Sequence, residues 1–197
     1  MKINPLLLFA PVILFSCQSP ASQENLSSAT AETSASPAPQ NPVPRENSEY
    51  LDWHTLRING KYPLVTKVKD MEGLLGKPDS VVKVDFEEGC PGSFRNENSK
   101  VAHYGGVSFE QFGDSLKFLG VDFSNEKRVF LQSGNLRIDH TTSPAVLKKH
   151  FPNAMKNFAK DSTEAVAIPP AKEPVDGHWL LQFEKGKLKF IDDWFPC

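Results

Sequence analysis

The sequence predicts an α+β domain: an antiparallel sheet of hairpin-connected strands with two short helices on one face. Three observations predict this class. Asn59-Gly60 separates two short apolar runs, which is a strong hairpin signal. Short alternating runs with Gly-containing breaks fill residues 101–138. Two segments that start near Thr66 and Ser143 have helical apolar spacing and end at Gly or Pro.

The first elements of the domain follow "LRINGKYPLV", the predicted hairpin. Thr66 is the expected cap of a helix that Gly76 and Pro78 end. The apolar residues that share one face of this helix are Val68, Met71, Leu74 and Leu75. "SVVKVDFE" then alternates as a strand, and a loop containing Cys90 follows it.

Five further strands are predicted in the middle of the chain. Their sequences are "VAHY", "VSFEQF", "LKFLGVDFS", "RVFLQS" and "NLRIDH". Phenylalanines recur through these strands at Phe109, Phe118, Phe123 and Phe130. We interpret them as one core face of the sheet, in preference to a cage for a ligand.

A second helix is expected in "TTSPAVLKKHFPNA", where Ser143 precedes Pro144 in the first helical turn. The residues expected to face inward are Val146, Leu147, His150 and Phe151. "MKNFAK" continues this helix or forms another short one, and "PPAKEPVDG" is a loop. The chain ends in two strands around Lys185-Gly186.

The N-terminal region predicts export. Residues 1–16 combine Lys2 with an apolar run of about ten residues, half the length of a membrane-spanning helix. "LFSC" resembles the lipobox of bacterial lipoproteins, although Phe15 replaces the usual small residue. That resemblance implies a diacylglycerol on Cys17, and Gln18 implies sorting to the outer membrane, facing the periplasm. The alternative is an ordinary signal peptide that is cut elsewhere.

Residues 17–48 are dominated by Ser, Ala, Pro, Gln and Asn and predict a disordered tether. Its expected reach is roughly 30 Å, and a Pro-rich ligand is the alternative interpretation. Residues 49–197 are predicted to form a single globular domain. The whole chain has 22 Lys and Arg, 24 Asp and Glu and a net charge of −2. Because no basic stripe is present, nucleic acid is excluded as an expected partner.

Two segments align when Thr66 is set against Thr142, which suggests two tandem helix-plus-sheet repeats. The alternative is that any α+β domain has amphipathic helices before strands. The layout, with the "LLGKPDSV" turn, resembles the β-lactamase-inhibitor-like fold and the small outer-membrane-assembly lipoproteins. The resemblance implies a scaffold that binds other proteins, and it transfers no catalytic residue.

The sequence contains no recognised catalytic or metal-binding motif. The five histidines, His54, His103, His140, His150 and His178, lack the spacing of a zinc site. Adjacent carboxylates such as those of "IDDW" point to opposite faces of a strand and form no acid/base pair by themselves. We therefore expect no cofactor, metal or catalytic residue. A carboxylate or histidine pair that meets through the fold stays open.

Cys90 and Cys197 are the thiols that remain once Cys17 is lipidated. Export places them where disulfides persist, so we expect a structural disulfide between them. Two unpaired thiols are the alternative. The sequence therefore favours a membrane-anchored, non-enzymatic protein-binding module. A periplasmic inhibitor or immunity-type protein and an envelope hydrolase are the alternatives.

Overall fold

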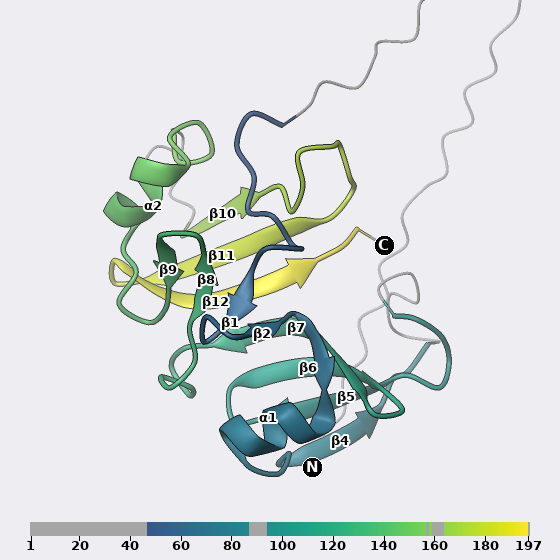
Figure 1. Ribbon diagram of the computed structural model, residues 1–197. Coiled ribbons are helices and arrows are strands. Elements are labelled where there is room, and N and C mark those ends of the chain that lie inside the picture. Colours follow the sequence, from purple (N-terminus) through teal and green to yellow (C-terminus); the bar gives the residue numbers. More distant parts are fainter. Residues whose placement is uncertain (1–46, 87–93, 157, 159–163, 197) are drawn as a thin grey trace, which may run out of the picture. The chain divides into compact units, whose positions relative to one another are not determined.

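The computed structural model describes residues 47–86, 94–156, 158 and 164–196. Within these ranges the chain is mainly antiparallel β-structure with two short helices, which confirms the α+β class. The strands form two sheets and not the single sheet expected from the sequence. The smaller has the order β2-β1-β8-β9, and the larger the order β10-β11-β12-β7-β6-β5-β4 with β3 beside β7 (Figure 1).

The four-stranded sheet consists of two hairpins. Its strands are β1 (Arg57–Ile58), β2 (Tyr62–Pro63), β8 (Leu131–Ser133) and β9 (Leu136–Ile138). Asn59 and Gly60 have φ of 51° and 68°, the left-handed backbone that a two-residue hairpin turn requires. This confirms the first predicted hairpin. The prediction that "RVFLQS" and "NLRIDH" continue the main sheet is wrong, because β8 pairs with β1.

The eight-stranded sheet holds the remaining strands. They are β3 (Val65–Lys67), β4 (Ser80–Lys83), β5 (Lys100–Tyr104), β6 (Val107–Phe112), β7 (Ser115–Asp122), β10 (Ala165–Ile168), β11 (His178–Glu184) and β12 (Lys187–Trp194). The meander β5-β6-β7 and the hairpin β11-β12 confirm the sequence-based assignment. Strands β3 and β10 had no counterpart in the sequence-based prediction.

Helix α1 (Val68–Leu75) ends at Gly76, whose φ is 93° and whose N–H donates to the Glu72 carbonyl at 3.0 Å. The predicted cap at Thr66 is wrong. Thr66 lies in β3, and Lys67 occupies the cap position without a side-chain hydrogen bond to the helix. Pairing of β3 with β7 holds the chain extended through Lys67, so the helix starts one residue later than a cap at Thr66 would start it.

Helix α2 (Pro144–His150) has Ser143 at its cap and Pro144 in its first turn, as expected. Leu147 and Phe151 are buried, but Val146 and His150 are exposed, against the prediction. A helix of seven residues buries one narrow stripe, and Val146 and His150 fall outside it. Residues 155 and 156 form a turn and a bend and do not extend the helix.

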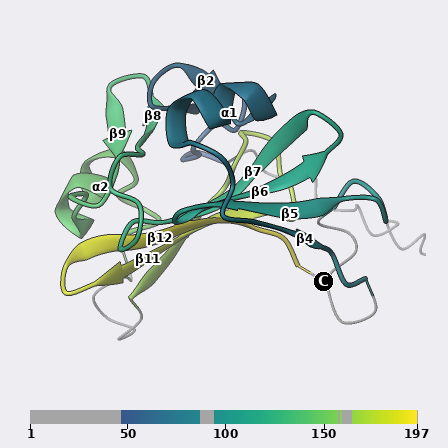
Figure 2. The same cartoon turned by 90° about the horizontal axis from the view of Figure 1, so that it is seen from below.

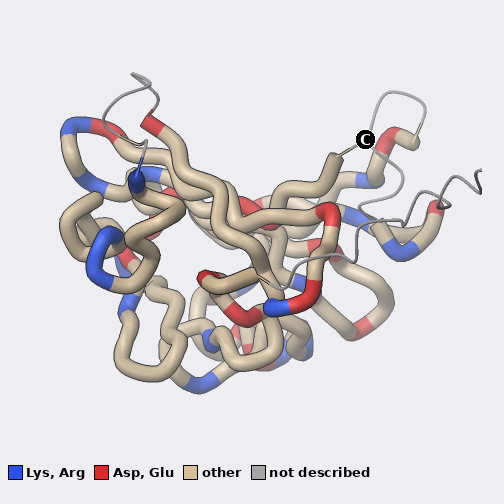
Figure 3. Tube along the Cα trace, turned by 90° about the horizontal axis from the view of Figure 1, so that it is seen from above, with Lys and Arg blue, Asp and Glu red and all other residues tan. Residues whose placement is uncertain are grey.

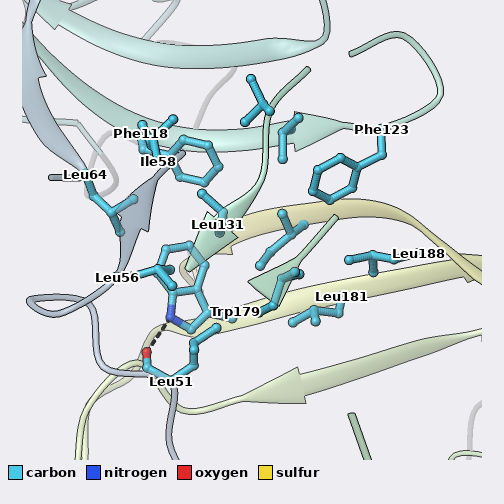
Figure 4. Packing of buried hydrophobic residues seen from close by; sticks show 14 of the residues in the cluster. Leu51, Leu56, Ile58, Leu64, Phe118, Phe123, Leu131, Trp179, Leu181 and Leu188 are labelled. Atoms are coloured by element: carbon cyan, nitrogen blue, oxygen red, sulfur yellow. Dashed lines mark hydrogen bonds between the residues drawn. The ribbon is translucent and has the colours of Figure 1, made fainter. Parts of the chain in front are cut away.

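The core lies between the two sheets and α1. Trp179 is fully buried and packs among Leu51, Leu56 and Leu131, and its indole N–H donates to the Leu51 carbonyl at 2.8 Å (Figure 4). Phe109, Phe118 and Phe123 are buried as predicted. Phe130 is half-buried, and the Arg137 guanidinium lies 3.6 Å from its ring centre.

Figure 2 shows α1, α2 and the four-stranded sheet on the same side of the eight-stranded sheet. The described residues leave the opposite side of that sheet open. We call this side the open face. Residues 1–46, Cys90 and Cys197 lie outside the described residues, so lipidation of Cys17, the disordered tether and the disulfide stay predictions.

Candidate functional site

The candidate site lies where two strands share one edge of β7. Strand β3 pairs with Ser115–Lys117 of β7, and β12 pairs with Gly120–Asp122. Strand β6 occupies the other edge over the whole length of β7. Strands β3 and β12 therefore pair with successive parts of the same edge of β7. Strand β12 extends two residues beyond Asp192, the last residue that pairs with β7.

A pocket of about 300 Å³, which we call the β12 pocket, lies beside this end of β12. Its lining residues are Trp53, His54, Lys117, Pro170, Ala171, Val175, Gly177, Asp193 and Phe195. Most of this surface is aromatic or aliphatic, and one ion pair supplies the charge. Its volume is at the lower end of the range for ligand pockets, which suits one large side chain.

Trp53 forms a rigid wall of the pocket. Its ring stacks on that of Trp179 with centroids 5.0 Å apart and an interplanar angle of 11°. The Trp53 backbone N–H donates to the Pro170 carbonyl at 2.9 Å, and that of Leu51 donates to the Pro169 carbonyl at 2.9 Å. These bonds tie residues 51–53 to the loop after β10, so two walls of the pocket are fixed to each other.

The ion pair joins Lys117 of β7 to Asp193 of β12, with Nζ 3.3 Å from Oδ2. The Lys117 ammonium also lies 5.5 Å from the centre of the Trp53 ring. The Asp193 side chain is 12% exposed. Burial raises the pKa of the Asp193 carboxyl, and the Lys117 charge and hydrogen bond oppose that rise. Asp193 is thus a carboxylate held in a partly desolvated place by one lysine.

Two of the side chains that line this pocket are apolar and exposed. Val175 and Phe195 are 45% and 43% exposed. The Phe195 ring lies over Gly177, where a Cβ would be 2.9 Å from Phe195 Cδ2. The glycine thereby lets the ring lie against the backbone. Exposed aromatic and aliphatic groups beside a preformed pocket are typical of a binding surface.

A second polar arrangement crosses the open face. His103, Ser108, Gly120 and Asp192 occupy one row through the registers of β5, β6, β7 and β12. His103 Nδ1 and Ser108 Oγ are 3.0 Å apart. Ser108, not the imidazole, lies between the other two polar groups, so the row lacks the order of a Ser-His-Asp triad.

Asp192 covers Gly120 in this row, because a Cβ at position 120 would collide with the Asp192 carboxylate. Burial and, to a smaller extent, the charge of Asp122 raise the pKa of Asp192 to about 6. The two neighbouring carboxylates of "IDDW" therefore point to opposite faces, as the sequence predicted. Asp193 meets Lys117, whereas Asp192 lies beside Gly120 and Asp122.

The predicted candidate residues are dispersed. His54 lines the β12 pocket and His103 is in the open-face row, while His150 is on the exposed side of α2. Within the described ranges, no three His, Cys, Asp or Glu side chains come together as metal ligands. Sequence reasoning missed Trp53 and Lys117. The signal available for the pocket was the aromatic and acidic end of "KFIDDWF", which follows a strand.

Comparisons of the chain with protein-family models, with curated proteins and with solved structures found no match. No helix in the described part of the chain is long and apolar enough to cross a membrane. Figure 3 shows Lys and Arg interspersed with Asp and Glu along the described trace.

Proposed function

We propose that this chain is a lipid-anchored, non-enzymatic module of the bacterial envelope that binds another protein through the β12 pocket. One observation carries the proposal: exposed Val175 and Phe195 line a pocket whose walls are already fixed. A partner that inserts an apolar side chain buries this surface without ordering new backbone, which lowers the cost of association. Aromatic anchors in such pockets supply most of the affinity of protein interfaces.

The proposed location of the protein rests on its N-terminal sequence. A diacylglycerol on Cys17 together with an N-acyl chain exceeds what stable membrane anchoring requires. Residues 17–48, as a flexible tether, would let the domain reach partners roughly 30 Å from the bilayer. By analogy with bacterial lipoproteins, Gln18 after the lipidated cysteine favours sorting of the protein to the outer membrane, where the domain would face the periplasm. An inhibitor or immunity-type protein of the periplasm is a special case of this proposal, with a toxin or hydrolase as the partner.

We also propose that the domain is a tandem duplication, as in the fold that the sequence resembles. Each half runs hairpin, helix, then meander: β1-β2, α1 and β5-β6-β7, followed by β8-β9, α2 and β10-β11-β12. The order β2-β1-β8-β9, and the part β10-β11-β12-β7-β6-β5 of the larger sheet, read the same from either end when the halves are exchanged. Strands β3 and β4 have no equivalent among the described strands of the second half. This arrangement supports a pseudo-two-fold axis between β1 and β8 and between β7 and β12.

The sequences of the two central strands support the same proposal. Strand β7 and the residue after it read "SLKFLGVDF", and the matching stretch of β12 reads "KLKFIDDWF". Gly120 and Asp192 are equivalent in this alignment, and they are also paired in the sheet. Asp192, Asp193 and Trp194 stand where the first half has Gly120, Val121 and Asp122. Of these three, Asp193 lines the β12 pocket, and its equivalent Val121 has no charge, which supports binding at the β12 end.

Site-specific photo-cross-linking in intact envelopes tests the proposed function. A benzophenone amino acid replaces Val175 in one variant and Val82 in a matched control, since both valines are exposed and Val82 lies on the distant edge strand β4. The proposal predicts a discrete protein adduct from position 175 that position 82 does not give. Identical adduct patterns, or no protein adduct from position 175, would contradict it.

A further inference from the structure

The β12 pocket contains a hydrogen-bond acceptor that the described residues leave open. The Lys117 ammonium lies 3.3 Å from Asp193 Oδ2. Among the described residues no side chain donates to Oδ1, and this oxygen is not one of their buried atoms without a partner, so water in the open pocket reaches it. An oxygen that loses this water when a ligand binds needs another donor, because an unmet acceptor keeps its desolvation cost. A ligand that closes the pocket over Asp193 therefore needs a donor at its inner end.

The surroundings of Asp193 select the kind of donor. The Lys117 ammonium already neutralises the carboxylate and would repel an arginine or lysine that entered beside it. The walls at Trp53, Val175 and Phe195 favour a flat apolar body. A neutral aromatic ring with a hydroxyl at its far end meets both conditions.

We propose that the β12 pocket receives a tyrosine side chain of a partner protein, whose ring packs on the apolar walls and whose hydroxyl donates to Asp193. This inference rests on the proposed function and names the chemistry of the partner. Phenylalanine fills the same walls but leaves the carboxylate without a donor, so the pocket discriminates between the two.

The tyrosine has to come from another molecule. The chain has three tyrosines, Tyr50, Tyr62 and Tyr104, and all three are among the described residues. None of them lines the pocket. Residues 1–46 and 87–93 contain no tyrosine, so no segment outside the described ranges supplies this group.

Titration of the full mature chain in detergent micelles tests the inference. The probes are N-acetyl-tyrosinamide, N-acetyl-phenylalaninamide and N-acetyl-argininamide, and the readout is the indole N–H resonance of Trp53. We expect the tyrosine compound to bind about fivefold or more tighter than the other two, because its hydroxyl bonds to a charged acceptor. In Asp193→Asn this preference should fall below about twofold.

Asp192→Asn is the matched control, since it removes the neighbouring charge on the opposite face and should leave the preference unchanged. An unshifted Trp179 indole signal shows that each variant keeps its fold. Equal affinity for the tyrosine and phenylalanine compounds, or a preference that survives in Asp193→Asn, would overturn the tyrosine inference. A protein adduct from position 175 would still support the proposed function in that case, and its absence would remove both.

Discussion

Replacing Asp192 with asparagine should stabilise the domain at neutral pH. The folded protein raises the pKa of Asp192 to about 6 from an ordinary value of 3.8, through burial beside Gly120 and the charge of Asp122. A carboxyl whose pKa is higher in the folded state binds more protons when folded, so the free energy of unfolding falls as pH rises from about 4 to 6. Below pH 4 the carboxyl is protonated in both states and this loss disappears.

Above pH 6, this pKa difference corresponds to a loss of about 3 kcal/mol in the free energy of unfolding. The Asp192 side chain is partly exposed, and solvent screening reduces the expected effect to about 1–2 kcal/mol. Urea unfolding should therefore show Asp192→Asn to be about 1–2 kcal/mol more stable than the natural chain at pH 7.5. At pH 4 the two should agree within about 0.5 kcal/mol.

The control is Asp176→Asn, which removes an exposed carboxylate. It should change the free energy of unfolding by less than about 0.5 kcal/mol at either pH. The reasoning is refuted if Asp192→Asn lowers stability at pH 7.5, or if it raises stability equally at both pH values. Either result would mean that Asp192 is not a desolvated charge in the folded domain.

Gly106→Ala should lower the free energy of unfolding by about 1–3 kcal/mol in urea melts, because its Cβ collides with a backbone carbonyl of β7; Gly73→Ala, with open space in α1, should instead raise it by about 0.5–1 kcal/mol. Cys17→Ser should abolish metabolic labelling with a palmitate analogue and release the protein from membranes, and unchanged labelling would disprove the anchor. Reduction of the predicted Cys90–Cys197 bridge should lower the melting temperature with little change in far-UV circular dichroism, since the bridge contributes up to about 4–5 kcal/mol by restricting the unfolded chain. Two free thiols in the unfolded, non-reduced mature chain would exclude it.

Local turn chemistry made the hairpins predictable. Asn59-Gly60 and Lys185-Gly186 each supply left-handed backbone at two successive turn positions, and the flanking runs pair as the sequence indicates. The local sequence does not indicate which other strand a hairpin pairs with. Strand β8 pairs with β1, from residues more than seventy positions earlier, and this pairing creates the second sheet. The alternating pattern of β8 fits pairing with β1 as well as it fits a further strand of the larger sheet, so it does not distinguish the two.

The pocket was predictable in part for the same reason. Alternation along "IDDW" correctly places Asp192 and Asp193 on opposite faces. Which face is covered depends on how Trp53 and Trp179 stack, a contact between residues at opposite ends of the domain. Strand β10 was missed because "AVAI" is short and carries no turn signal, and it is held by β11.

The affinity of the cross-linked partner for the purified full chain tests the central claim most directly. Isothermal titration calorimetry would compare the natural chain with Val175→Asp and with Val82→Asp, two exposed valines on separate parts of the domain. If the β12 pocket is the contact surface, Val175→Asp should weaken binding by about tenfold or more, which is about 1.4 kcal/mol. Val82→Asp should stay within about twofold of the natural chain. Equal loss in both variants, or no loss in Val175→Asp, would contradict the account.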